Sequence, residues 1–239
     1  MNKTSIPWTD YSSNPLIVLN RVTGRRGWWC TKVSPGCAHC YSERINRGRL
    51  GNGLAYLPTN AEKIEFQLNE REFEAWRKRK TPSKIFVCDM TDLFHEQVSF
   101  EFIETVWFRM KEARQHTFQI LTKRADRMYA VLRSMYANPN WQNLGVPENV
   151  WLGVSVENQR TADERVPLLL ETLAAVRFLS CGPLLEHIDL TDYLPYRLPV
   201  YKQMDGFLKP TAIAELYWTS VFAGSSSRAR ADQDSARWT

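Results

Sequence analysis

Three of the five cysteines, Cys30, Cys37 and Cys40, lie within eleven residues, around a Ser-Pro-Gly turn. Thiolates gathered this closely are typical ligands of soft metal centres. Three of them leave the fourth position of a tetrahedral or cluster site to another ligand. The spacing C-x6-C-x2-C therefore indicates a metal centre with one open position, such as a [4Fe-4S] cluster whose fourth iron can hold a small molecule.

A structural zinc site fits this spacing less well. Such a site normally has two closely spaced Cys or His pairs, and here only Cys37 and Cys40 form one. Cys88 and Cys181 stand alone at the ends of apolar runs, a position more typical of buried thiols. We expect a reducing compartment, in which thiols serve metals or chemistry and do not form disulfides.

Bulk composition is that of a globular protein. The 239 residues are 44% hydrophobic and 24% charged, which disfavours wholesale disorder. Neither a run of about 18 apolar residues nor a signal-peptide core is present, so we expect a cytoplasmic protein with no membrane partner. The net charge of +5 and the basic runs GRRGWWCTK and WRKRKTPSK suit a polyanion, although such runs are more often solvated faces.

The elements that must position the cysteines follow a regular rhythm. Apolar runs at residues 84–89, 116–121, 149–154 and 175–180 predict strands, and the 3.6-residue period of 100–113, 125–136 and 161–172 predicts helices between them. Strand starts 26 to 33 residues apart match the size of a βα unit. We also expect a first strand at 16–19, a short helix after Cys40, a charged helix at 62–80, a sixth strand at 218–224 and a poorly ordered tail. Residues 212–218 fit either a helix or a strand.

Polar residues follow the apolar strands at the point where each strand ends. In a parallel sheet all these ends lie on one side, where α/β proteins place their sites. The sequence therefore predicts a pocket there, lined by Asp89, Thr91, Asp92, Thr122, Lys123, Arg124, Ser155, Glu157, Asn158 and Cys181.

Five blocks in order resemble a known family: CTKVSPGCAHCYSERI, DMTDLFHE, HTFQILTKRADRM, VWLGVSVENQRTADERVPLLL and VRFLSCGPLL. They are similar to the phage-encoded and bacterial three-cysteine proteins of unassigned function, which resemble the radical S-adenosylmethionine (SAM) superfamily. The resemblance covers roughly residues 5–192. It implies an α/β fold, a partial (β/α)6 barrel of the radical SAM type.

The resemblance also implies a cofactor set. Cys30, Cys37 and Cys40 would ligate three irons of a [4Fe-4S] cluster, and SAM would chelate the fourth. Reduction would then cleave SAM to a 5′-deoxyadenosyl radical that abstracts hydrogen from an unknown substrate. The six-residue gap departs from the superfamily's commoner C-x3-C-x2-C.

Individual roles for SAM follow from position and chemistry. Asp89 or Asp92 would accept from its amino group, Lys123 or Arg124 would pair with its carboxylate, and Ser155 and Glu157 would hold the ribose. His39, before the last cysteine, would lie near the adenine, or else on the surface. Tyr41 and Thr122 complete the expected cofactor-binding set. For His95 a capping or packing role is favoured over proton transfer.

The carboxyl-terminal part departs from the relatives. Gly182 stands where they tend to carry an acid, and their Gly-Gly-Glu-Ser-Gly segment has no counterpart in FAGSSSRARADQDSARWT. We therefore expect a barrel core over 1–192 and a truncated or divergent segment over 193–239.

A degenerate, inactive family member is one alternative. Another is a zinc-stapled nucleic-acid or partner-binding module with Arg25, Arg26, Trp28 and Trp29 beside the cysteines. Expected partners of the enzyme are an electron donor, a substrate with nucleic acid or nucleotide among the candidates, and a protein that covers the open side of the barrel.

Overall fold

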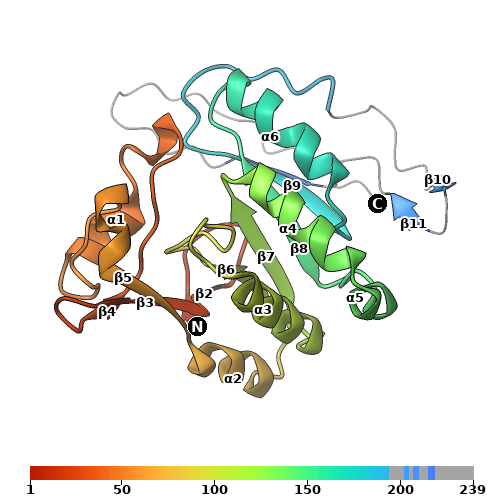
Figure 1. Cartoon of the computed structure of the whole chain (residues 1–239). Helices are drawn as coiled ribbons and strands as arrows, with labels where there is room; N and C mark the ends of the chain where they lie inside the picture. Colours follow the sequence, from red (N-terminus) through yellow and green to blue (C-terminus); the bar gives the residue numbers. More distant parts are fainter. Residues whose placement is uncertain (194–201, 205–206, 210–214, 219–239) are drawn as a thin grey trace.

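The computed structural model describes residues 1–193, 202–204, 207–209 and 215–218. Its main sheet contains six parallel strands (Figure 1). The strand order is β1-β2-β6-β7-β8-β9-β12, and the short β1 pairs antiparallel with β2 at one end. The strands are β1 (Asn2–Lys3), β2 (Tyr11–Ser13), β6 (Lys84–Val87), β7 (Thr117–Thr122), β8 (Val150–Ser155), β9 (Val176–Cys181) and β12 (Glu215–Trp218). The predicted mixed α/β class is confirmed.

Helices cover one face of this sheet (Figure 1). They are α3 (Phe100–Glu112), α4 (Ala125–Ala137) and α6 (Gln159–Glu171), with the short α5 (Pro139–Leu144) after α4. Alternate strand residues such as Ile85, Phe118 and Leu152 are fully buried in one cluster with apolar residues of the helices. Ile103, Val106, Trp107 and Met110 supply this face of α3 at helical spacing. The predicted strands and helices in this region are confirmed within a few residues at each end.

A second, three-stranded antiparallel sheet stands beside the carboxyl-terminal edge of the main sheet. Its order is β4-β3-β5, made of β3 (Leu16–Asn20), β4 (Arg26–Gly27) and β5 (Ile64–Leu68). The segment between β4 and β5 contains the cysteines, η1 (Pro35–Cys37), α1 (Tyr41–Arg47) and η2 (Pro58–Lys63). Its small core is formed by Val18, Trp29, Tyr56 and Ile64.

Two sequence predictions are corrected here. The strand predicted at 16–19 exists, but it belongs to the antiparallel sheet, and β2 is the first parallel strand. The helix predicted over 62–80 is shorter, α2 (Glu70–Lys78), because residues 64–68 form β5. The run Ile-Glu-Phe-Gln-Leu alternates apolar and polar residues, which is the period of a strand.

Only some of the predictions for the carboxyl-terminal segment concern residues that the structure describes. Glu215–Trp218 is the sixth parallel strand, β12, so the segment that fitted either helix or strand is a strand at that point. The strand predicted at 218–224 and the tail lie outside the described residues after position 218. β10 (Lys202–Met204) pairs antiparallel with β11 (Phe207–Lys209). Within the described part of the chain, no helix has the length and apolar character needed to cross a membrane.

Candidate functional site

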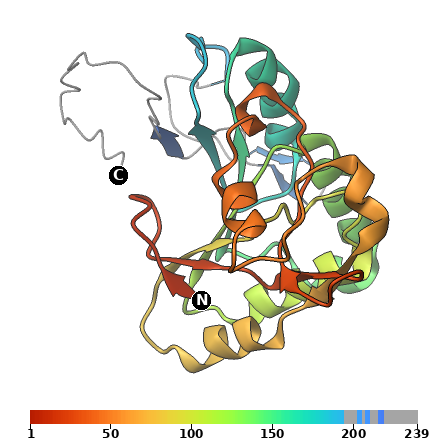
Figure 2. The ribbon, with the colours of Figure 1, turned by 90° about the vertical axis from the view of Figure 1, so that its left-hand side faces the viewer.

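The cysteine loop, residues 30–40, runs past the carboxyl ends of the parallel strands and faces the viewer in Figure 2 together with α1. Polar side chains that follow β6, β7 and β8 contact the loop and the residue after it at three separate points.

The first contact is made by Arg124, two residues after the end of β7. Its Nη1 lies 3.6 Å from Cys30 Sγ, and its Nη2 donates to the Thr31 carbonyl at 3.1 Å and to Thr31 Oγ1 at 2.8 Å. Asp92 holds the guanidinium at 3.1 Å and accepts from the Thr122 hydroxyl at 2.8 Å. Arg124 is 4% exposed and Asp92 6%, so a buried ion pair fixes the loop at Cys30.

The second contact is made by Glu157, beyond the end of β8. Its carboxylate accepts from Ser34 Oγ at 2.8 Å and from the Gly36 amide at 3.1 Å, and it pairs with the Lys123 ammonium. Burial alone would raise the pKa of Glu157, but Lys123 and these donors outweigh it and hold the pKa below its usual value. A Cβ at position 36 would lie 2.5 Å from the Glu157 carboxyl carbon, so this close approach requires glycine.

The third contact is made by Asp89, which follows β6. The Tyr41 hydroxyl donates to the Asp89 carbonyl at 2.8 Å, and Asn14 donates to its carboxylate at 2.6 Å. Burial raises the pKa of Asp89. Between strand and contact stands Cys88, whose φ of 64° lies in the left-handed region that few residues other than glycine adopt.

His95 contacts the start of the cysteine loop. Its Nδ1 accepts from the Gln97 amide at 3.1 Å, so the proton is on Nε2, which donates to Thr31 Oγ1 at 3.0 Å. The ring is 2% exposed and packs edge-on against Trp29. Burial, together with the nearby Arg124 charge, lowers the pKa of His95 to about 4. These contacts agree with the packing role favoured from the sequence.

The remaining predicted residues lie apart from these contacts. Ser155 is buried at the end of β8, and its carbonyl accepts from Arg165 at 2.7 Å. His39 is exposed on the loop. Sequence reasoning did not single out Ser34, Asn14 or Arg165. Ser34 lies inside the conspicuous turn, whereas Arg165 is one more charged residue of a helix and gives no signal.

Comparison with known proteins identifies the family. The family described as "Protein of unknown function (DUF5131)" matches residues 3–239. The chain belongs to this family. No curated protein and no solved structure matches it.

In this DUF5131 protein the three cysteines are partly exposed and unpaired by disulfides. Cys37 Sγ lies 3.8 Å from Ser34 Oγ, and Cys40 Sγ lies 3.0 Å from Ser42 Oγ. Burial raises the pKa of the Cys30 thiol to about 12, opposed by Arg124. Within the described ranges, no three His, Cys, Asp or Glu side chains converge as ligands of one metal ion.

A single zinc ion and an iron–sulfur cluster would place different demands on these three cysteines. One zinc ion requires all its ligands within about 2.3 Å of the same point. The thiolates of an iron–sulfur cluster bind different irons, so they need not converge in this way. Arg124 beside Cys30 also supplies positive charge that would compensate a thiolate.

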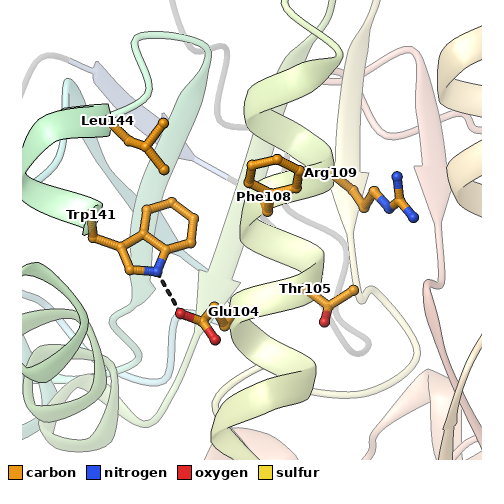
Figure 3. A pocket seen from close by; sticks show the side chains of 6 residues that line it. All are labelled: Glu104, Thr105, Phe108, Arg109, Trp141 and Leu144. Atoms are coloured by element: carbon orange, nitrogen blue, oxygen red, sulfur yellow. Dashed lines mark hydrogen bonds between the residues drawn. The ribbon is translucent and has the colours of Figure 1, made fainter. Parts of the chain in front are cut away.

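The DUF5131 protein has a separate surface hollow of about 410 Å³ between α3 and α5 (Figure 3). Phe108, Trp141 and Leu144 line it, and the Trp141 indole donates to Glu104 at 2.5 Å. Since α5 lies in the connection that leads into the start of β8, this hollow lies toward the amino-terminal ends of the strands. It is therefore distinct from the site at the cysteine loop.

Proposed function

We propose that this protein binds a [4Fe-4S] cluster through Cys30, Cys37 and Cys40, binds SAM beside it, and acts as a radical SAM enzyme. The observation that carries the proposal is the meeting of the cysteine loop with three strand ends of one parallel sheet. The carboxyl ends of parallel strands are where α/β proteins bind their cofactors. The six parallel strands likewise support a partial (β/α)6 barrel.

When bound, the reduced cluster would supply the electron that cleaves SAM to a 5′-deoxyadenosyl radical. The protein's own part is to hold the loop in place. Arg124 and Glu157 do so through partly buried hydrogen bonds to Thr31, Ser34 and Gly36. Such contacts would keep the part of the loop from Cys30 to Cys37 in position before the metal arrives.

The predicted SAM ligands fall into two groups by exposure. Asp92, Thr122, Ser155 and Glu157 are buried. In this proposal they act by positioning their neighbours. His39 and Tyr41 are exposed, and Asp89 and Lys123 are partly exposed. These four are the residues proposed to face SAM, with Lys123 toward its carboxylate and Asp89 toward its amino group.

Anaerobic reconstitution with iron and sulfide tests the proposal. We expect about four irons per chain and, with dithionite and SAM, formation of 5′-deoxyadenosine. Cys37→Ala should lose most of the iron and the product. Cys181→Ala is the matched control, because this thiol is buried in the core at the end of β9 and should leave iron content unchanged. Uptake of zinc without iron by the wild-type protein, or equal iron in Cys37→Ala, would contradict the proposal.

A further inference from the structure

The segment that contains the cysteines also concentrates positive charge. Residues 21–50 hold seven Arg and Lys and a single acid, Glu43, a net +6 against +5 for the whole chain. The other 209 residues together therefore carry about −1. Six of the seven basic residues are arginines, whose planar fork matches phosphate oxygens.

The fold brings the two halves of this segment together. Arg25, in the turn between β3 and β4, donates through Nη2 to the carbonyls of Gly48 at 2.8 Å and Gly51 at 2.5 Å. It thereby fastens the turn to the loop that follows α1. Arg26 of β4 and Arg44, Arg47 and Arg49 on or just after α1 thus belong to one compact unit, and their side chains are exposed. We call these four residues the basic surface.

The charge of the basic surface is not neutralised by neighbours. Within the part of the chain that the structure describes, its four side chains form no ion pair, and Glu43 is paired with Lys32 at 3.1 Å. The other basic run differs, because Arg77 and Lys78 both pair with Glu74 on their own helix. An uncompensated cluster of exposed arginines is the electrostatic footprint expected of a polyanion site.

The basic surface adjoins the cysteine loop. α1 begins at Tyr41, directly after Cys40, so Arg47 lies about 9 Å further along the helix axis. Tyr41 is 46% exposed. An exposed aromatic ring beside arginines is the usual platform on which an unpaired base stacks.

We propose that the basic surface binds the phosphate backbone of a nucleic acid and presents it to the cysteine loop. An anionic membrane fits the charge but not the apolar surface. Val22, Val33, Ile45 and Leu50 of this segment are exposed. Its single α-helix, α1, has only seven residues, which are too few for the amphipathic helix face that interfacial anchoring uses. Arginine density together with an exposed tyrosine favours nucleic acid.

Fluorescence anisotropy with labelled single-stranded DNA and RNA of about 30 nucleotides tests this proposal on the full chain. Affinity should fall steeply between about 50 and 200 mM salt as counterions are released. The combined variant Arg44→Ala, Arg47→Ala, Arg49→Ala should bind at least about tenfold more weakly, with a log–log salt slope shallower by about 2. The matched control, Arg77→Ala, Lys78→Ala, Lys80→Ala, removes three exposed cations from the region of α2 and should bind within about twofold of wild type.

Three results would overturn the proposal: salt-independent or absent binding by the wild type, equal weakening in the control, or capture by phosphatidylserine vesicles without binding to nucleic acid. The test does not depend on the cluster. Cys37→Ala removes a proposed iron ligand and keeps the surface, so it should bind nucleic acid as the wild type does. Iron uptake without nucleic-acid binding refutes this proposal alone, and binding without iron uptake refutes the enzymatic one alone.

Discussion

The two ends of the cysteine loop are held by contacts of different kinds. At Cys30 the loop follows the buried Trp29 and is fixed by Arg124, which is itself paired with Asp92 in the interior. At Cys40 the neighbouring contact is made by Tyr41, whose hydroxyl donates to the Asp89 carbonyl at 2.8 Å and lies 3.5 Å from its carboxylate, and whose side chain is 46% exposed. A lost partner leaves a buried charge at the first end, whereas water can replace it at the second. The Cys30 end should therefore be far more sensitive to substitution.

The largest effect is expected for Arg124→Met. Removing one partner of a buried ion pair typically costs about 3–5 kcal/mol of unfolding free energy. We expect the lower end of this range, about 3 kcal/mol, because Asp92 still accepts hydrogen bonds from the Thr122 hydroxyl and the Phe94 amide. Urea unfolding of the metal-free protein measures the loss.

Arg160→Met is its control. Arg160 pairs with Glu164 on the surface and is 83% exposed, so it should change stability by about 1 kcal/mol or less. Equal stability of Arg124→Met and wild type would show that the Cys30 end is not held by this pair.

Protonation of His95 is expected to have the second-largest effect on the unfolding free energy. Burial lowers its pKa from 6.5 in the unfolded chain to about 4 in the folded chain. Between these values the unfolded state binds more protons, so stability is fully present above about pH 6.5 and is lost as the pH falls toward 4. Linkage predicts a loss of about 2 kcal/mol at pH 5.

Unfolding free energies measured from pH 7 to pH 4 check this dependence. His95→Gln should flatten the profile in this window, whereas His39→Gln, which changes an exposed ring, should not. An unchanged slope in His95→Gln would assign the acid sensitivity of the protein to other groups.

The sequence was sufficient for four of the parallel strands, β6 to β9, and for the polar residues at their carboxyl ends. Apolar runs with polar ends locate β6 to β9, because such strands are buried on both faces and their ends turn toward one edge. It was insufficient for the antiparallel sheet. Leu16–Asn20 pairs with a strand over 40 residues later, and no turn between them signals the pairing.

The contacts made by individual side chains also could not be predicted from the sequence. Asp92, Lys123 and Glu157 were predicted at the strand ends, where they lie. Their partners were not predictable: Glu157 contacts Ser34 and Gly36 more than 120 residues away in the chain. Position relative to a strand follows from local periodicity, but the direction of a long charged side chain depends on which loop packs over the edge.

The smallest effect is expected at the Cys40 end, and two tyrosines make it measurable. Tyr41 and Tyr56 each donate at 2.8 Å to a backbone carbonyl, of Asp89 and Met90 respectively, but Tyr56 is only 2% exposed. Tyr41→Phe should cost about 0.5 kcal/mol, because water can reach the freed carbonyl, whereas Tyr56→Phe should cost about 1–3 kcal/mol, because a buried carbonyl is left unsatisfied. Urea unfolding of both variants measures the difference. If Tyr41→Phe were as destabilising as Tyr56→Phe, both ends of the loop would be firmly held, and the contrast between them would be wrong.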